Sequence, residues 1–140
     1  MTALTEAREE WKVGDQVELV VGRISRTTLA LFAGGSGDHN PIHLDLDVAR
    51  GAGLDDVFAQ GMLSMAYLGR LVTDHFPQHQ LRTFATRFSA ITPVNAEPTC
   101  FGEVVGVDGS TLTLDLRVEL SDGTVTLAGQ ATLNQKDSTA

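Results

Sequence analysis

The C-terminal half of the chain alternates between apolar and polar residues with a period of two. Four runs show this alternation: QLRTFATRFSAI (80–91), TCFGEVVGV (99–107), TLTLDLRVEL (111–120) and TVTLAGQATLN (124–134). In the third run, leucines and a valine fall on one face while Thr, Asp, Arg and Glu fall on the other, as in a half-buried strand. Asp108-Gly109 and Ser121-Asp122-Gly123 between the last runs are hairpin signals. The pattern predicts an antiparallel meander with one buried face.

The preceding segment from Gly61 to Phe76, GMLSMAYLGRLVTDHF, has a different period. Its apolar residues recur at spacings of three and four, which predicts a helix: Met62, Met65, Ala66, Leu68, Leu71 and Val72. The apolar positions cover more than one stripe, so we expect burial on most sides, and Pro77 ends the helix. One long helix and one antiparallel sheet predict an α+β domain whose sheet wraps the helix. The free sheet edges indicate a partner subunit.

The N-terminal half is predicted to be less regular. Residues 17–25 form a strand pattern with Gly22 as a bulge, and Thr27-Thr28 start a short helix that ends at Gly34-Gly35. Residues 45–50 predict one or two helical turns. With no repeat or linker, the 140 residues are expected to form one domain, with a flexible tail at 135–140.

Composition narrows the class of function. The net charge of −8 disfavours nucleic-acid binding, because phosphates would be repelled. No apolar run approaches the roughly 18 residues of a membrane helix, and the charged N-terminus shows no secretory signal. Cys100 is the sole cysteine, so no intramolecular disulfide forms; we interpret it as a packed small hydrophobe. A cytoplasmic location away from membranes is expected.

The segment GGSGDHNPIHLD (34–45) carries the candidate chemistry. It lacks both phosphate-loop patterns. His39 and His43 have a metal-ligand spacing, but Pro41 between them prevents the helix that this spacing requires, and we predict no metal site. A simple turn is one interpretation. The other is that Asp38, Asn40 and His43 form an acid, an orienting amide and an imidazole. Without a serine or cysteine nucleophile, such a set indicates acid–base chemistry on water or a carbon acid.

A resemblance appears at this point. SGDHNPIHLD, then AQGML at the start of the long helix, then RFSAITPV, resemble the MaoC-like (R)-specific enoyl thioester hydratases, also called hydratase 2. The resemblance extends from roughly Phe32 to the last predicted strand. It implies a hot-dog fold, an antiparallel sheet wrapped around one long helix, in agreement with the pattern above. It also implies reversible hydration of a trans-2-enoyl thioester, usually of coenzyme A, to an (R)-3-hydroxyacyl thioester, without a cofactor.

The resemblance also implies roles for residues. Asp38 and His43 match the catalytic dyad and Asn40 an orienting residue, while the backbone N–H of Gly61 matches an oxyanion donor. Such a donor at a helix N-terminus faces the developing charge with the helix dipole behind it. The substrate-binding candidates are Gln60, Met62, Phe58 and Arg87. This chain departs from the family at Gln60, where many members have His, and at Gly69, where some carry a serine.

Two other functions stay open. A thioesterase is possible because one fold hosts several activities. The chain can also be a subunit of a heteromer with little activity alone. The expected partners are an acyl thioester of coenzyme A or of acyl carrier protein, and a second hot-dog chain in a homodimer or heteromer.

Overall fold

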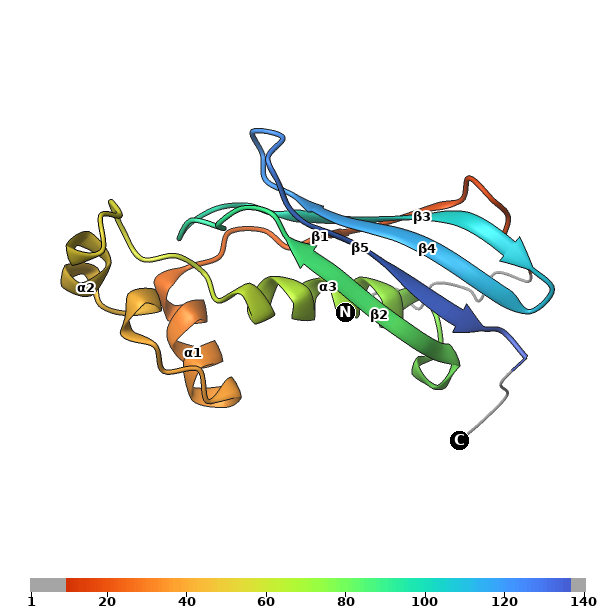
Figure 1. Ribbon diagram of the computed structural model, residues 1–140, viewed down its shortest axis with the longest axis horizontal. Coiled ribbons are helices and arrows are strands. Elements are labelled where there is room, and N and C mark those ends of the chain that lie inside the picture. Colours follow the sequence, from red (N-terminus) through yellow and green to blue (C-terminus); the bar gives the residue numbers. More distant parts are fainter. Residues whose placement is uncertain (1–9, 137–140) are drawn as a thin grey trace.

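The computed structural model describes residues 10–136. Its α+β architecture is a single antiparallel sheet that covers one long helix, with shorter helices gathered beyond one end of that helix (Figure 1). Residues 1–9, where no secretory signal is expected, and residues 137–140 of the predicted tail lie outside the described residues. Within the described part of the tail, the Gln135 N–H donates to the Ser110 carbonyl at 2.8 Å.

The sheet has five strands in the order β1-β3-β4-β5-β2, and every neighbouring pair is antiparallel. The strands are β1 Gln16–Val20, β2 Leu81–Phe88, β3 Thr99–Asp108, β4 Thr111–Glu119 and β5 Val125–Asn134. The predicted meander is therefore confirmed, and both hairpin glycines, Gly109 and Gly123, have positive φ. Strands β1 and β2 form the two edges.

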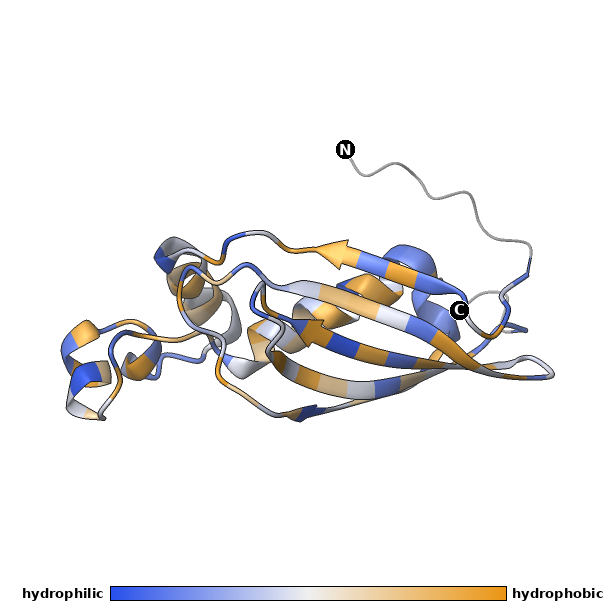
Figure 2. Cartoon of the chain, turned by 90° about the horizontal axis from the view of Figure 1, so that it is seen from above, coloured by the Kyte–Doolittle hydropathy of each residue, from blue (hydrophilic) through white to orange (hydrophobic). Residues whose placement is uncertain are grey.

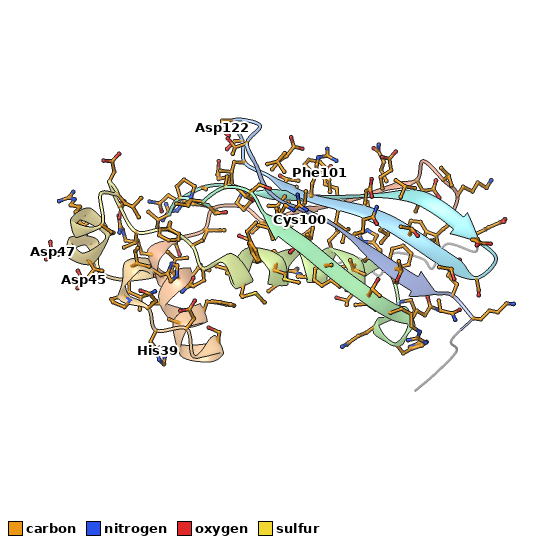
Figure 3. The ribbon with its side chains drawn as sticks, in the orientation of Figure 1. His39, Asp45, Asp47, Cys100, Phe101 and Asp122 are labelled. Atoms are coloured by element: carbon orange, nitrogen blue, oxygen red, sulfur yellow. The ribbon has the colours of Figure 1, made fainter. Side chains whose placement is uncertain are left out.

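Alternation along the strands separates the two faces of the sheet (Figure 2). On β4, the side chains of Leu112, Leu114, Leu116 and Val118 are buried against the helix side. Neighbouring residues on β3 show the same division: Cys100 is fully buried, whereas Phe101 stacks under the Arg117 guanidinium on the opposite face (Figure 3).

Helix α3, Gly61–His75, packs one stripe onto this core. Its buried residues are Leu63, Ser64, Leu68, Leu71 and Val72. The expectation that the helix is buried on most sides is wrong for the single chain, because Met62, Ala66, Arg70 and Thr73 form an exposed stripe. A single-layer sheet can cover only one side of a helix, so apolar residues remain at the surface of the other side.

The chain leaves β1 earlier than predicted. The strand ends at Val20, and just after it Gly22, with a φ of +79°, interrupts the regular ladder. The following residues still run beside the sheet, since the Val21 and Ile24 N–H groups donate to the carbonyls of Pro98 and Ala96.

Three short helical elements follow: α1 Arg26–Ser36, the 3-10 turn η1 Pro41–His43 and α2 Leu46–Gly51. Ser25, not Thr27 or Thr28, caps α1, because its Oγ accepts from the Thr28 N–H. The helix continues through the Gly34-Gly35 pair and ends where Gly37 adopts the left-handed conformation. Another 3-10 turn, η2 Gln78–Gln80, connects α3 to β2.

A second apolar cluster fastens these elements to the start of α3. It consists of Ile24, Leu29, Ala49, Val57, Ala59 and Leu63. Each of these side chains is less than 9% exposed. The cluster therefore fixes the loop between α1 and α2 relative to the helix N-terminus.

In the described part of the chain, α3 and the other helices are too short or too polar to span a lipid bilayer.

Candidate active site

The loop after α1 is held by short-range hydrogen bonds. The Asp38 N–H donates to Ser36 Oγ at 3.2 Å, and the Asn40 N–H donates to Asp38 Oδ1 at 3.3 Å. The Asn40 side-chain oxygen then accepts from the Ile42 N–H at 3.1 Å and caps η1. Asn40 thus contacts Asp38 through its backbone, while its amide shapes the turn. The segment is therefore a hydrogen-bonded turn, and the same turn carries the Asp38 carboxylate and the His43 imidazole.

His43 turns inward from η1 and is only 8% exposed. Its Nδ1 lies 2.8 Å from the Phe58 carbonyl oxygen, and its ring meets the Phe58 ring edge to face with centroids 4.8 Å apart. A carbonyl can only accept, so Nδ1 carries the proton, and in the neutral ring Nε2 keeps its lone pair. Nε2 lies 3.8 Å from Asp38 Oδ2. The dyad predicted from the sequence is therefore a spatial pair.

His39 takes no part in this pair. It is exposed and points away from the body of the molecule near the end of α1 (Figure 3). Between residues 10 and 136, no group of three or more His, Cys, Asp or Glu side chains lies close enough together to hold a metal ion.

The four residues from Phe58 to Gly61 join separate parts of the fold. The Phe58 carbonyl receives His43, and the Ala59 N–H donates to the Thr92 carbonyl at 2.9 Å. The Gln60 Nε2 donates to the Leu29 carbonyl of α1 at 2.9 Å. Gly61 is the first residue of α3, so its N–H has no acceptor within the helix. An N–H donor with the helix dipole behind it therefore stands three residues from the carbonyl that holds His43.

A largely apolar hollow of about 370 Å³ adjoins Gly61. Its lining includes Phe58, Gly61, Ser64, Phe88, Ile91 and Thr92. Two buried hydroxyls, Ser64 Oγ and Thr92 Oγ1, lie 3.4 Å apart in this lining. A Cβ added at Gly61 would lie 3.0 Å from Phe88 Cε1, so the aromatic ring and the helix N-terminus are in close contact.

A second apolar hollow, of about 420 Å³, lies on the α1 side of α3 and is lined by Thr28, Leu31, Phe32, Gly35, Ser36 and Leu63. Since Ser36 bonds to Asp38, this hollow reaches the other flank of the dyad loop. The larger hollow of about 670 Å³ lies on the outer face of the sheet among Glu103, Asp115 and Arg117, and none of the candidate catalytic residues lines it.

The predicted substrate-binding residues occupy different places. Phe58 lines the hollow beside Gly61, and Met62 is 57% exposed on the first turn of α3. The Gln60 side chain is fully buried, and its amide N–H donates to the Leu29 carbonyl. Arg87 lines the hollow on the outer face of the sheet, whereas its neighbour Phe88 faces α3. The structure thus brings Phe58 together with His43 and Gly61, and leaves Gln60 and Arg87 out of this cluster.

Sequence reasoning missed Ser64, Thr92 and Phe88. A sequence signal existed for Ser64, which stands one helical turn after Gly61 in an otherwise apolar stretch. Phe88 and Thr92 lie in the segment RFSAITPV, which resembles the family, but the sequence did not show that the folded sheet brings residues near 90 to the start of α3.

Outside the Asp38–His43 pair, the ionisable groups of Cys100 and Asp56 have shifted pKa values. Burial raises the pKa of the Cys100 thiol to about 12, so it stays protonated and is no nucleophile at neutral pH. The Arg26 guanidinium, 2.9 Å from Asp56 Oδ1, holds the pKa of the Asp56 carboxyl below its ordinary value. This exposed pair links the first turn of α1 to the segment that leads into Phe58.

Comparison with curated proteins finds no match, whereas solved structures are similar over most of this chain. The (R)-hydratase PhaJ1 from Pseudomonas aeruginosa, in the unliganded form, shares 26% identity over 89% of this chain and 82% of that chain, with a TM-score of 0.81. A MaoC-like dehydratase shares 32% identity over 89% of this chain and 40% of that chain, with a TM-score of 0.74. The ChsH1–ChsH2 complex from Mycobacterium tuberculosis shares 22% identity over 88% and 97% of the two chains, with a TM-score of 0.79, which is a likeness of fold alone.

These neighbours confirm the hot-dog fold predicted above. The MaoC-like domain family matches residues 8–126, which include the dyad loop, the start of α3 and the strands that cover it. On this evidence, the chain belongs to the MaoC-like domain family.

Proposed function

We propose that this protein is a hydro-lyase that reversibly adds water to a trans-2-enoyl thioester to give an (R)-3-hydroxyacyl thioester. Membership of the MaoC-like family and likeness to an (R)-hydratase support hydratase or dehydratase activity. The observation that carries the finer proposal is the pairing of His43 Nε2 with Asp38 Oδ2 at 3.8 Å, beside the segment that opens α3.

The dyad suits the activation of one water. An ionised carboxylate only accepts, and Nε2 also accepts because Nδ1 donates to Phe58. Two acceptors 3.8 Å apart do not bond to each other, but one water can donate a hydrogen bond to each. Its oxygen lone pair is then free to attack the β-carbon. The dyad takes one proton from the water as the C–O bond forms, and returns a proton to the α-carbon on the same face.

The thioester oxygen gains negative charge when the β-carbon is attacked. In our proposal it lies against the Gly61 N–H, where the helix dipole stabilises the charge. A preorganised donor of this kind lowers the barrier by roughly 3 kcal/mol. Gly61 carries no Cβ, which lets the Phe88 ring pack against the helix start and form an apolar wall beside the N–H.

Among enoyl thioesters, the substrate proposed is one of coenzyme A. The apolar lining by Phe58, Phe88 and Ile91 suits an acyl group next to the Gly61 N–H. Acyl carrier protein is the second choice, because carrier proteins are acidic and this chain has a net charge of −8. A cytoplasmic location fits such a substrate.

A partner chain belongs to the proposal as well. Strands β1 and β2 are free edges, and large apolar side chains near β2 are half exposed: Met62 at 57%, Phe88 at 51% and Ile91 at 50%. Covering them with a second chain would bury apolar area and close the hollow beside Gly61. We propose a homodimer, with a heteromer of two hot-dog chains as the alternative.

The test is an assay of the purified chain with a trans-2-enoyl-CoA. We expect the enoyl absorbance to fall, an (R)-3-hydroxyacyl product on chiral analysis, and a dimer on gel filtration. Release of free thiol from a saturated acyl-CoA without hydration would establish the thioesterase instead. Activity only after addition of a second hot-dog chain would establish the heteromer.

A further inference from the structure

Gln60 is a fully buried polar side chain directly before Gly61. Its Nε2 donates to the Leu29 carbonyl at 2.9 Å, and its Oε1 has no hydrogen-bond partner in the described part of the chain. It is the N-cap residue of α3, but its side chain makes no capping hydrogen bond. The amide therefore connects the beginning of α3 to α1 instead of capping the helix that it precedes.

Stability does not explain why an amide occupies this position. A hydrogen bond between neutral groups adds modestly to stability, whereas a buried polar atom without a partner costs as much or more. An apolar side chain of similar length would fill the same buried space without the unpaired oxygen. The link from Gln60 to Leu29 needs another explanation.

We infer that Gln60 is a positioning residue that sets the Gly61 N–H relative to the Asp38–His43 pair. This inference rests on the proposed function. Two connections run from the segment Phe58–Gly61 to the dyad. The Phe58 carbonyl fixes the His43 ring, and the Gln60 amide fixes α1.

The second connection reaches Asp38 through α1 itself. The C-terminal residue of that helix, Ser36, accepts from the Asp38 N–H, and Gly37 closes the helix between them. A slide or rotation of α1 against α3 would therefore shift Asp38 relative to both His43 and Gly61. The other contacts between these helices in this cluster are apolar and non-directional, so the Gln60 hydrogen bond supplies a direction.

Two variants separate positioning from stability. Gln60→Met removes the donor and also the unpaired oxygen at similar side-chain length. We expect an unchanged or higher melting temperature, a KM within about twofold, and a kcat for enoyl-CoA hydration that is lower by about 10- to 100-fold. The matched control is Gln80→Met, since Gln80 Nε2 donates to the Gln135 carbonyl beyond the far end of α3. Its kcat should stay at the wild-type value.

Gln60→Glu gives a pH signature that Gln60→Met cannot give, and melting temperatures measured at each pH separate it from a recovery of stability. The carboxylic acid can donate to the Leu29 carbonyl, but the carboxylate cannot. Burial favours the neutral form, so the recovery should lie above the ordinary glutamate pKa. Relative to wild type, kcat of this variant should rise as the pH falls, and Gln60→Met should show no such recovery.

A readout without catalysis separates this inference from the proposed function. In 15N NMR spectra, the Asp38 amide and the His43 Nδ1–H resonances, both remote in sequence from residue 60, should move in Gln60→Met, and in Gln60→Glu both should titrate with one midpoint. A wild-type chain that hydrates nothing, with these shifts present, would refute the enzyme and keep the positioning. Unmoved resonances, or wild-type kcat in Gln60→Met, or a kcat loss that parallels a loss of melting temperature, would overturn the inference.

Discussion

The five-stranded sheet and the segment from Gly37 to Gly61 are held in different ways. The sheet is held by continuous ladders of backbone hydrogen bonds and by a large apolar cluster to which many residues contribute. The segment packs through the smaller apolar cluster, but its polar groups are placed by single hydrogen bonds. Among these are Ile42 N–H to Asn40, His43 to Phe58 and Gln60 to Leu29. Loss of one leucine from the sheet removes part of its packing, whereas loss of one polar contact from the segment changes where a functional group points.

The comparison teaches that stability and chemistry are separable in this fold. Stability comes from many interactions that add up over the sheet and its core, whereas the position of each functional group depends on a few directional contacts. The candidate catalytic groups lie on the second kind of structure, next to the rigid N-terminus of α3. Substitutions in the two regions should therefore affect different observables.

The largest effect is expected for Asp38→Asn. The carboxamide keeps the shape but is a poor proton acceptor, so hydration of enoyl-CoA should slow by about 10²- to 10⁴-fold. The side chain is 42% exposed, so the melting temperature should hardly change. Asp47→Asn on α2 is the matched control, since Asp47 is also an exposed carboxylate close in sequence, and it should retain activity. Full activity in Asp38→Asn would remove the proposed mechanism.

For Gly129→Ala in β5 we expect a loss of stability, in contrast to the loss of activity expected for Asp38→Asn. The new Cβ would lie 2.0 Å from the Ala85 carbonyl oxygen and 2.7 Å from Thr86 Cα, both of which are backbone atoms of the neighbouring strand β2. The strands must separate, and we expect the free energy of unfolding to fall by about 3 kcal/mol. Equilibrium unfolding in urea measures this free energy. Gly106→Ala, whose Cβ meets only Thr113 atoms at 3.6 Å, should leave stability nearly unchanged; equal losses would show that the strand contact is irrelevant.

A smaller change in the free energy of unfolding is expected when the pH is raised, because of the buried Cys100 thiol. Its folded pKa is raised from 9.0 to about 12 by burial, so the folded state favours the thiol. The stabilisation is present below the unfolded pKa and is lost as the pH rises from about 9 towards 12, by at most about 1.4 kcal/mol per pH unit. Chemical unfolding at pH 8 and pH 10 measures the loss, and Cys100→Ala should lack this component. Rapid alkylation of the folded thiol at pH 8 would contradict the assignment.

The smallest effect is expected for Arg26→Gln at the exposed pair with Asp56. The pair lowers the Asp56 pKa, so its stabilisation is present above the unfolded pKa and disappears as the pH falls through the folded pKa. At neutral pH the variant should show a small decrease in melting temperature that high salt abolishes. A large decrease that persists in high salt would show that Arg26 packs in a way the ion pair does not explain.

The sequence alone determined the parts of the fold that depend on short-range periodicity. The alternation in 111–120 predicted the buried face of β4, and the spacing after Gly61 predicted α3 to within one residue of its end. The family motif DHNPIH also predicted that Asp38 and His43 belong together, and the structure brings Nε2 and Oδ2 within 3.8 Å. Their roles in catalysis stay a prediction.

Only the tertiary structure decided what depends on distant contacts. The sequence could not show that β1 already ends at Val20, that Gln60 points into the core towards Leu29, or that Phe88 lies against Gly61. It also predicted a more buried α3 than the single chain has, because periodicity reveals which residues are apolar but not how many sides are covered. The physical reason is range: local patterns record the preferences of neighbouring residues, whereas these features arise where segments tens of residues apart meet.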